Sequence, residues 1–194
     1  MDYFALAGGW ILYFTVHSAM ASNHFKEASR RVLGSGYRFY RLFYSTVSLV
    51  GLVLLLLLNA NMNDNYFFSS EGPIRYLSLV LTTFGVMTIQ LAFRQYRASS
   101  FLGLAPEGQT LRKEGILKVI RHPIYSGLIL MTVGFFLFIP NAAALITSVC
   151  ILLYLPIGIS LEEKKMIRTF GQAYLDYRME VPALIPRLKR LRES

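Results

Sequence analysis

The sequence predicts an all-α, polytopic integral membrane protein with five transmembrane helices. Three observations predict this fold class. Of the 194 residues, 54% are hydrophobic and only 16% are charged, whereas an average soluble domain carries about a quarter charged residues. Several long segments have no charged residue, and the cationic residues gather between alternate segments. We therefore expect a multi-pass protein of the lipid bilayer.

Three uncharged segments are each about as long as a helix that crosses the bilayer, which needs about 20 mostly apolar residues. They are Tyr3–Ser22, Leu42–Leu58 and Tyr76–Phe93. We expect them to form the first three membrane helices. His17 is the only titratable imidazole within them.

The fourth uncharged segment, Ile124–Leu161, has 38 residues and is too long for one crossing. Pro140 and Asn141 lie at its centre. A proline breaks a helix, and a short polar residue caps the next one. The segment therefore predicts a tight hairpin of helices four and five.

The cationic residues predict the orientation of these helices, because Lys and Arg beside membrane spans prefer the cytoplasmic side. Nineteen of the 20 lie between helices one and two, between helices three and four, or after helix five, and only Arg75 lies elsewhere. This alternation requires five spans, with the N-terminus outside and the C-terminus in the cytoplasm. In a bacterium the host would be the inner membrane.

The charge and the cysteine count exclude several other classes of function. The net charge of +9 is spread over three membrane-proximal segments, as binding to anionic lipid headgroups requires, and no basic nucleic-acid-binding module occurs. We therefore expect membrane lipids and not nucleic acid as partners. One cysteine and three scattered histidines fit neither a disulfide framework nor a metal site.

Both ends of the predicted hairpin lie on the cytoplasmic face, so residues far apart in the sequence meet there. Arg121, His122 and Tyr125 at the start of helix four are expected near Glu162 and Glu163 at the end of helix five. Carboxylates at this depth are unfavourable unless paired or used, and a pocket open to both water and lipid is possible here. Alternatively, the arginine anchors at headgroups and the glutamates are a solvated helix end.

An ordered set of motifs surrounds these residues and resembles the isoprenylcysteine carboxyl methyltransferase family. The set comprises Glu114-Gly-Ile, Arg121-His-Pro-Ile-Tyr125, the helical hairpin, Glu162-Glu163, and Phe170-Gly-x-x-Tyr174-x-x-Tyr177-x-x-x-Val181-Pro182 with Pro186. The N-terminal part, with His17-Ser-Ala-Met-Ala21, Phe25-Lys26 and Tyr40-Arg-Leu-Phe-Tyr44, is similar to the bacterial methanethiol S-methyltransferase branch. Residues 1–194 are then one methyltransferase domain, with a cofactor-binding core at about residues 101–186.

The resemblance implies transfer of a methyl group from S-adenosylmethionine, held in a cytosolic pocket. By this resemblance, His122, Pro123 and Tyr125 line the cofactor site. The backbone around Glu114 and Gly115 contacts the adenosine or the amino-acid end of the cofactor. The acidic pair Glu162 and Glu163 accepts hydrogen bonds from its ammonium group or ribose hydroxyls, in keeping with the strength of charge-assisted hydrogen bonds.

The acceptor is expected to be small or lipophilic, and a thiol is favoured over a carboxylate. Carboxyl-methylating members carry an arginine about one turn before the acidic pair, but Pro156–Leu161 contains no cation here. A thiol reacts as its thiolate, which a nearby cation favours. Arg121 and His122 are therefore the candidate catalytic residues.

Three further residues are candidates for binding the acceptor. His17 lies inside a predicted span, where an ionisable side chain is a functional candidate by default, although a neutral histidine bonded to a neighbouring helix serves structure equally well. Tyr174 and Tyr177 lie one helical turn apart and can stack on a ligand, or they can anchor the tail at the membrane interface.

Two other functions remain open from the sequence. One is an NADPH-dependent membrane reductase of the sterol-reductase type, and the other is a non-enzymatic membrane assembly subunit. The sequence does not fix the oligomeric state.

Overall fold

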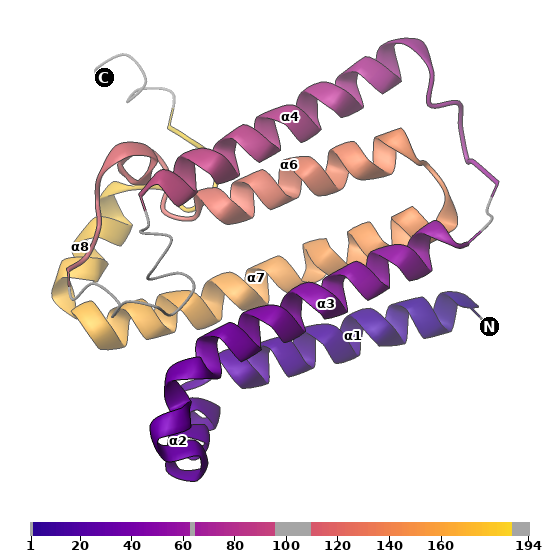
Figure 1. The fold of residues 1–194 in the computed structure, drawn as a ribbon. Coiled ribbons are helices and arrows are strands. Elements are labelled where there is room, and N and C mark those ends of the chain that lie inside the picture. The colour runs from indigo at the N-terminus through magenta and orange to yellow at the C-terminus, as the bar shows by residue number, and fades with distance from the viewer. Residues whose placement is uncertain (1, 63–64, 96–109, 188–194) are drawn as a thin grey trace. The chain divides into compact units, whose positions relative to one another are not determined.

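The computed structural model is helical and describes residues 2–62, 65–95 and 110–187 (Figure 1). No strand occurs within those ranges, in agreement with the predicted all-α class. The elements in chain order are α1 (Asp2–Ala21), α2 (Asn23–Leu33), the 3-10 helix η1 (Gly34–Phe39), α3 (Tyr40–Ala60), α4 (Gly72–Arg94), the 3-10 helix η2 (Gly115–Lys118), α6 (Pro123–Phe138), α7 (Ala142–Phe170) and α8 (Gln172–Glu180).

Four helical stretches in the described part of the chain are long and apolar enough to cross a membrane. The first is α1, and the second is the stretch Asn23–Ala60, which consists of α2, η1 and α3. The third and fourth are α4 and α7. The chain is thus built as a multi-pass membrane protein. The fifth predicted span, α6, has 16 residues and is about 24 Å long at 1.5 Å per residue, less than the bilayer core of about 30 Å. The count of five spans remains a prediction.

The break inside the longest uncharged segment lies where the sequence predicts it. Helix α6 ends at Phe138 and α7 begins at Ala142. The side-chain oxygen of Asn141 accepts a hydrogen bond of 2.8 Å from the backbone N–H of Ala144, which satisfies a free donor in the first turn of α7. The predicted cap is therefore confirmed.

Two compact units make up the chain. The first contains α1, α2, η1, α3 and the part of α7 that ends at Tyr154. The second contains α4, η2, α6, the part of α7 that begins at Leu155, and α8. The single-domain expectation remains a prediction.

The first unit has a small core around a tryptophan. Its buried hydrophobic members are Leu6, Trp10, Leu55 and Ala143. The indole N–H of Trp10 donates to the Thr147 hydroxyl at 3.0 Å, and the Asn59 amide donates to the same oxygen at 2.8 Å. These bonds link α1 and α3 to α7. They also give each of the three polar groups the hydrogen-bond partner that it needs among apolar helices.

The second unit places α6 directly against α4 (Figure 1). A Cβ atom on Gly127 would lie 2.6 Å from the carbonyl oxygen of Gly85, and one on Gly85 would lie 2.7 Å from the carbonyl oxygen of Gly127. Small residues allow two helix backbones to approach this closely in a membrane. This contact fixes α6, whose N-terminus carries the candidate site.

Candidate functional site

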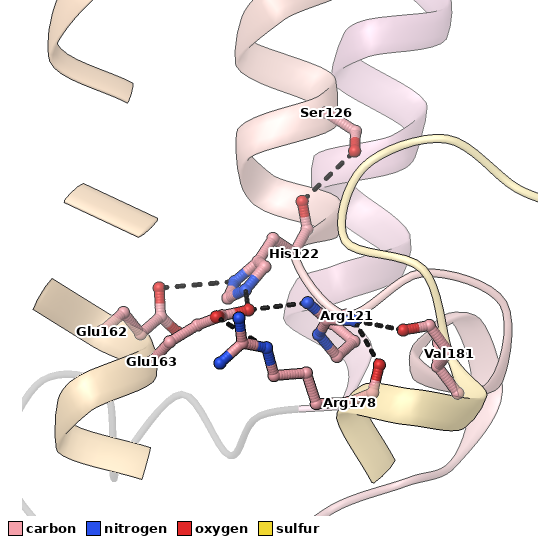
Figure 2. Close-up of polar contacts among 7 residues, drawn as sticks. All are labelled: Arg121, His122, Ser126, Glu162, Glu163, Arg178 and Val181. Carbon is pink, nitrogen blue, oxygen red and sulfur yellow. Dashed lines mark hydrogen bonds and ion pairs between the residues drawn. The ribbon is translucent and has the colours of Figure 1, made fainter. Parts of the chain in front are cut away.

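A cluster of charged side chains lies in the second unit, where the start of α6 meets the C-terminal half of α7 (Figure 2). We call it the polar cluster, and it comprises Arg121, His122, Glu162, Glu163 and Arg178. The predicted proximity of His122 to the acidic pair is confirmed. Because α7 continues to Phe170, the two glutamates lie within this helix and beyond its apolar part, which ends at Leu161.

Glu163 is the most fully paired member of the polar cluster. Its Oε1 accepts a hydrogen bond of 2.7 Å from Nη2 of Arg121 and lies 3.2 Å from Nε2 of His122, while its Oε2 lies 3.4 Å from Nε of Arg178. Burial alone would raise the pKa of Glu163, but hydrogen bonds from Arg121 and His122 outweigh it and lower the pKa. Glu163 is therefore held as a carboxylate.

Glu162 differs sharply from its neighbour. Its side chain is 36% exposed, against 12% for Glu163, and its Oε2 lies 3.7 Å from Nδ1 of His122. This distance is longer than a hydrogen bond. Glu162 thus presents a partly exposed carboxylate that is able to accept hydrogen bonds from a ligand.

His122 lies between the two carboxylates, and its side chain is only 3% exposed. Burial lowers the pKa of His122, but the neighbouring carboxylates of Glu162 and Glu163 outweigh burial and raise the pKa above the usual value. The carboxylates thus favour the protonated imidazolium form.

Arg121 joins the polar cluster to the segment after α8. Besides its bond to Glu163, its Nη1 donates to the carbonyl oxygen of Arg178 at 2.9 Å and to that of Val181 (Figure 2). The Arg121 side chain is 8% exposed. Its hydrogen bonds therefore hold α7 and the C-terminal segment together, which is a structural task in addition to any catalytic one.

Backbone donors at the start of α6 are satisfied by the same C-terminal segment. The N–H groups of Arg121 and His122 donate to the carbonyl oxygens of Pro182 and Ala183, each at 2.9 Å. These bonds fix the backbone at the two residues whose side chains enter the polar cluster.

Pro123 and Tyr125, two of the predicted cofactor-binding residues, lie in the first turn of α6. Pro123 is the buried first residue of this helix. The ring centroid of Tyr125 lies 5.7 Å from that of His122, in an edge contact. The Tyr125 ring also packs on Gly158 of α7, where a Cβ atom would lie 3.1 Å from its hydroxyl oxygen. Gly158 is one turn before Glu162, so Tyr125 lies beside the polar cluster.

Glu114 and Gly115, also predicted to bind the cofactor, lie at the start of η2. Glu114 is the exposed N-cap residue of η2. Gly115 has a φ of 55°, and its backbone lies so close to the Gln95 side chain that a Cβ atom would overlap it. Residues 101–109 of the predicted cofactor-binding core lie outside the described residues.

Tyr174 and Tyr177 are both buried in a hydrophobic cluster with Val181. The hydroxyl of Tyr177 donates to the carbonyl oxygen of Leu117 at 2.6 Å. Burial and the charge of Glu163 raise the pKa of Tyr174 to about 12, against the lowering effect of Arg121. These contacts join α8 to η2 and to the polar cluster. The substrate-binding role of the tyrosines stays a prediction.

His17 lies on α1 in the first unit, and its side chain hydrogen-bonds to two residues of α3. Its Nε2 lies 3.0 Å from the hydroxyl of Tyr44, and its Nδ1 lies 3.1 Å from the hydroxyl of Ser48. Its ring stacks on that of Tyr13 at 5.8 Å. These contacts match the alternative of a histidine that bonds a neighbouring helix, and its contact with substrate remains a prediction.

Sequence reasoning missed one member of the polar cluster, Arg178. Its side chain is 49% exposed and pairs with Glu163. The one signal was its place directly after Tyr177 in the C-terminal motif.

Fold and site together define an all-helical, multi-pass membrane protein with a partly buried charged cluster where the start of α6 meets the C-terminal half of α7. The chain belongs to the NnrU family, which it matches over residues 5–184. No solved structure resembles it at a significant level.

Its relatives include several methyltransferases. A methanethiol S-methyltransferase 2 of Bradyrhizobium diazoefficiens is 35% identical over an alignment of 129 positions, gaps included, that covers 62% of this chain and 41% of the relative. The methanethiol S-methyltransferase of Pseudomonas deceptionensis is 27% identical over an alignment of 201 positions, gaps included, that covers 92% of this chain and 71% of the relative.

The plant protein-S-isoprenylcysteine O-methyltransferase B of Arabidopsis thaliana is 31% identical over 81 residues, or 41% of each protein. The chain thus spans about two fifths of the length of the first and the third of these relatives. The resemblance predicted from the motifs, to isoprenylcysteine carboxyl methyltransferases and to the methanethiol S-methyltransferase branch, is confirmed.

Proposed function

We propose that the chain is a membrane methyltransferase that uses S-adenosylmethionine and methylates a small or lipophilic acceptor, with a thiol favoured over a carboxylate. The observation that carries the proposal is the unequal acidic pair, in which Glu163 is fully paired and Glu162 is not. The printed names of the methyltransferase relatives support the same activity.

The residues of the polar cluster fit this cofactor. S-adenosylmethionine supplies a methyl group on a sulfonium, and it also carries an ammonium group and ribose hydroxyls. Glu162 is a partly exposed acceptor for such donors, and charge-assisted hydrogen bonds of this type are strong. His122, Pro123 and Tyr125 would form the wall beside it. The backbone of Glu114 and Gly115 would hold another part of the cofactor.

The remaining charges have a different task in this proposal. Glu163 fixes the positions of Arg121 and His122, so that both cations stay in place when the acceptor enters. A thiol acceptor would react as its thiolate after releasing its proton to water, and the nearby cations would stabilise the thiolate. Methyl transfer itself requires only in-line alignment and exclusion of water. His17, Tyr174 and Tyr177 are proposed contacts for the acceptor.

Calorimetry on the folded protein in detergent tests the cofactor. We expect binding of both S-adenosylmethionine and S-adenosylhomocysteine, and a loss of affinity of at least 10-fold in Glu162→Gln, since a charged hydrogen bond contributes about 1.5–3 kcal/mol. Lys164→Gln is the matched control, because this exposed residue lies two positions further along α7. Absence of heat with both ligands would refute the proposal, and binding of NADPH instead would favour the reductase alternative.

A transfer assay tests the acceptor. The labelled methyl group of S-adenosylmethionine is followed into small thiols, prenylated cysteine analogues and lipid amines. We expect label in the thiols. Label in the prenylated carboxylates alone would overturn the preference for a thiol, and cofactor binding without transfer to any compound would favour the non-enzymatic assembly subunit.

A further inference from the structure

Helix α2 and η1 connect two membrane-length helices of the first unit, α1 and α3. Within α2 the apolar residues Phe25, Ala28 and Val32 recur at helical spacing, while Glu27 and Arg31 lie on the opposite face. This pattern is typical of an amphipathic helix. This amphipathic helix was not predicted from the sequence, because the segment also has the composition of a basic loop.

The apolar side of this helix is not covered by the described part of the protein. Helix α2 contains no buried residue, and Val32 is 83% exposed. The next apolar side chains, Leu33 and Phe39, are 49% and 55% exposed. In Figure 1, α2 turns away from α1 and α3 at their shared end. In a soluble protein such a face packs on the core, whereas between two membrane helices it meets lipid.

The polar side is strongly basic. Between Asn23 and Arg41 there are five cations and one carboxylate: Lys26, Arg30, Arg31, Arg38, Arg41 and Glu27. Two of the guanidinium groups lie over aromatic rings, that of Arg30 at 4.9 Å from the Tyr37 centroid and that of Arg38 at 4.6 Å from the Phe39 centroid. Aromatic rings favour the boundary between acyl chains and water, which is also the depth of lipid phosphates.

We propose that α2 and η1 form an interfacial surface that binds anionic phospholipid headgroups. Phe25 and Val32 insert among the acyl chains, and Arg30, Arg31 and Arg38 contact the phosphates. Charge complementarity and the direct continuity with two membrane-length helices select a lipid surface over a protein partner. The proposal does not depend on methyl transfer.

A fluorescence experiment on the full chain in vesicles tests both parts of the proposal. Cys150, the only cysteine, is replaced by alanine, and a bimane label is attached to Val32→Cys or, as the control on the opposite face, to Glu27→Cys. The vesicles contain phosphatidylcholine and phosphatidylglycerol, one of which carries brominated acyl chains. We expect blue-shifted emission and quenching at position 32, and water-like emission at position 27.

The headgroup preference is read from the same label. Brominated phosphatidylglycerol should quench position 32 more than brominated phosphatidylcholine at equal mole fraction. In R30Q/R31Q the relative affinity for phosphatidylglycerol should fall by up to roughly 30-fold, from about 1 kcal/mol for each cation near the surface. K164Q/R168Q removes the same charge from exposed positions of α7 and should leave the preference unchanged.

Three outcomes would overturn this proposal. Water-like emission at position 32 would exclude insertion of the apolar face. Equal quenching by the two lipids would exclude an anionic preference. An equal loss in R30Q/R31Q and K164Q/R168Q would show that net charge, and not this surface, attracts the lipid.

Discussion

At the scale of single residues, the two adjacent glutamates of α7 should respond differently to neutralisation. Glu163→Gln removes the carboxylate that pairs with buried Arg121 and leaves His122 with only the more distant Glu162, and we expect a loss of about 2–4 kcal/mol in unfolding free energy. Glu162→Gln removes only a partly exposed carboxylate 3.7 Å from His122, so the loss should be below about 1 kcal/mol. Denaturant unfolding in detergent measures both, and equal losses would contradict the assigned division.

His122 should make stability dependent on pH. Its pKa is raised in the folded protein, from about 6.5 in the unfolded chain. Its stabilising contribution is therefore complete below about pH 6.5 and is lost as the pH rises through the folded value. His122→Asn should flatten this part of the profile of melting temperature against pH. His24→Asn, at an exposed position of α2, is the control and should leave the profile unchanged.

Glu163 contributes with the opposite sign. Its pKa is lowered on folding, so its contribution is present above the unfolded value of about 4.3 and is lost as the pH falls. Between about pH 4.3 and pH 6.5, Glu163 and His122 are both charged in the folded protein. The stabilisation from this ion pair should therefore be largest in that pH range.

At the scale of elements, the contact between α4 and α6 should tolerate no added side chain. Gly127→Ala places a Cβ atom 2.6 Å from a backbone oxygen that cannot move independently, and we expect a loss of about 1–3 kcal/mol. Gly8→Ala in α1 is a matched control, because nothing lies within 4 Å of its added Cβ atom. The control should be neutral or stabilising by about 0.5–1 kcal/mol. Thermal unfolding of the two variants in the same detergent compares them.

The elements that follow from long apolar segments or from a local helix break could be predicted from the sequence. The amphipathic helix α2 was not predicted. The apolar lengths of α1, α3 and α4 and the break at Pro140 and Asn141 are properties of short continuous segments. Helix α2 was hidden because its cations resemble those of a cytoplasmic loop. The 16 residues of α6 show that absence of charge gives a helix but does not fix whether it crosses the membrane.

The candidate site shows the same limit. The meeting of His122 with Glu162 and Glu163 could be predicted, because a hairpin brings its two open ends together. The bonds from Arg121 to the carbonyl oxygens of Arg178 and Val181 could not, because every residue has a carbonyl oxygen and no sequence pattern identifies the one that is used.

At the scale of the whole molecule, the distribution of cations predicts which face each loop occupies. With Cys150 replaced by alanine, a cysteine at Glu71 should react with a membrane-impermeant maleimide on intact cells. A cysteine at Glu180 should react only after the cells are made permeable. Both positions are exposed. Reaction of both cysteines, or of neither, on intact cells would contradict the five-span arrangement.

The backbone bonds from Arg121 and His122 to Pro182 and Ala183 bear on how the protein is handled. Proteolytic cleavage just after α8 would remove the hydrogen-bond acceptors of these two backbone N–H groups at the start of α6. The position of the His122 side chain would then be less well fixed. An affinity tag is therefore best fused to the N-terminus. The mass of any inactive preparation should first be measured by mass spectrometry to detect truncation at the C-terminus.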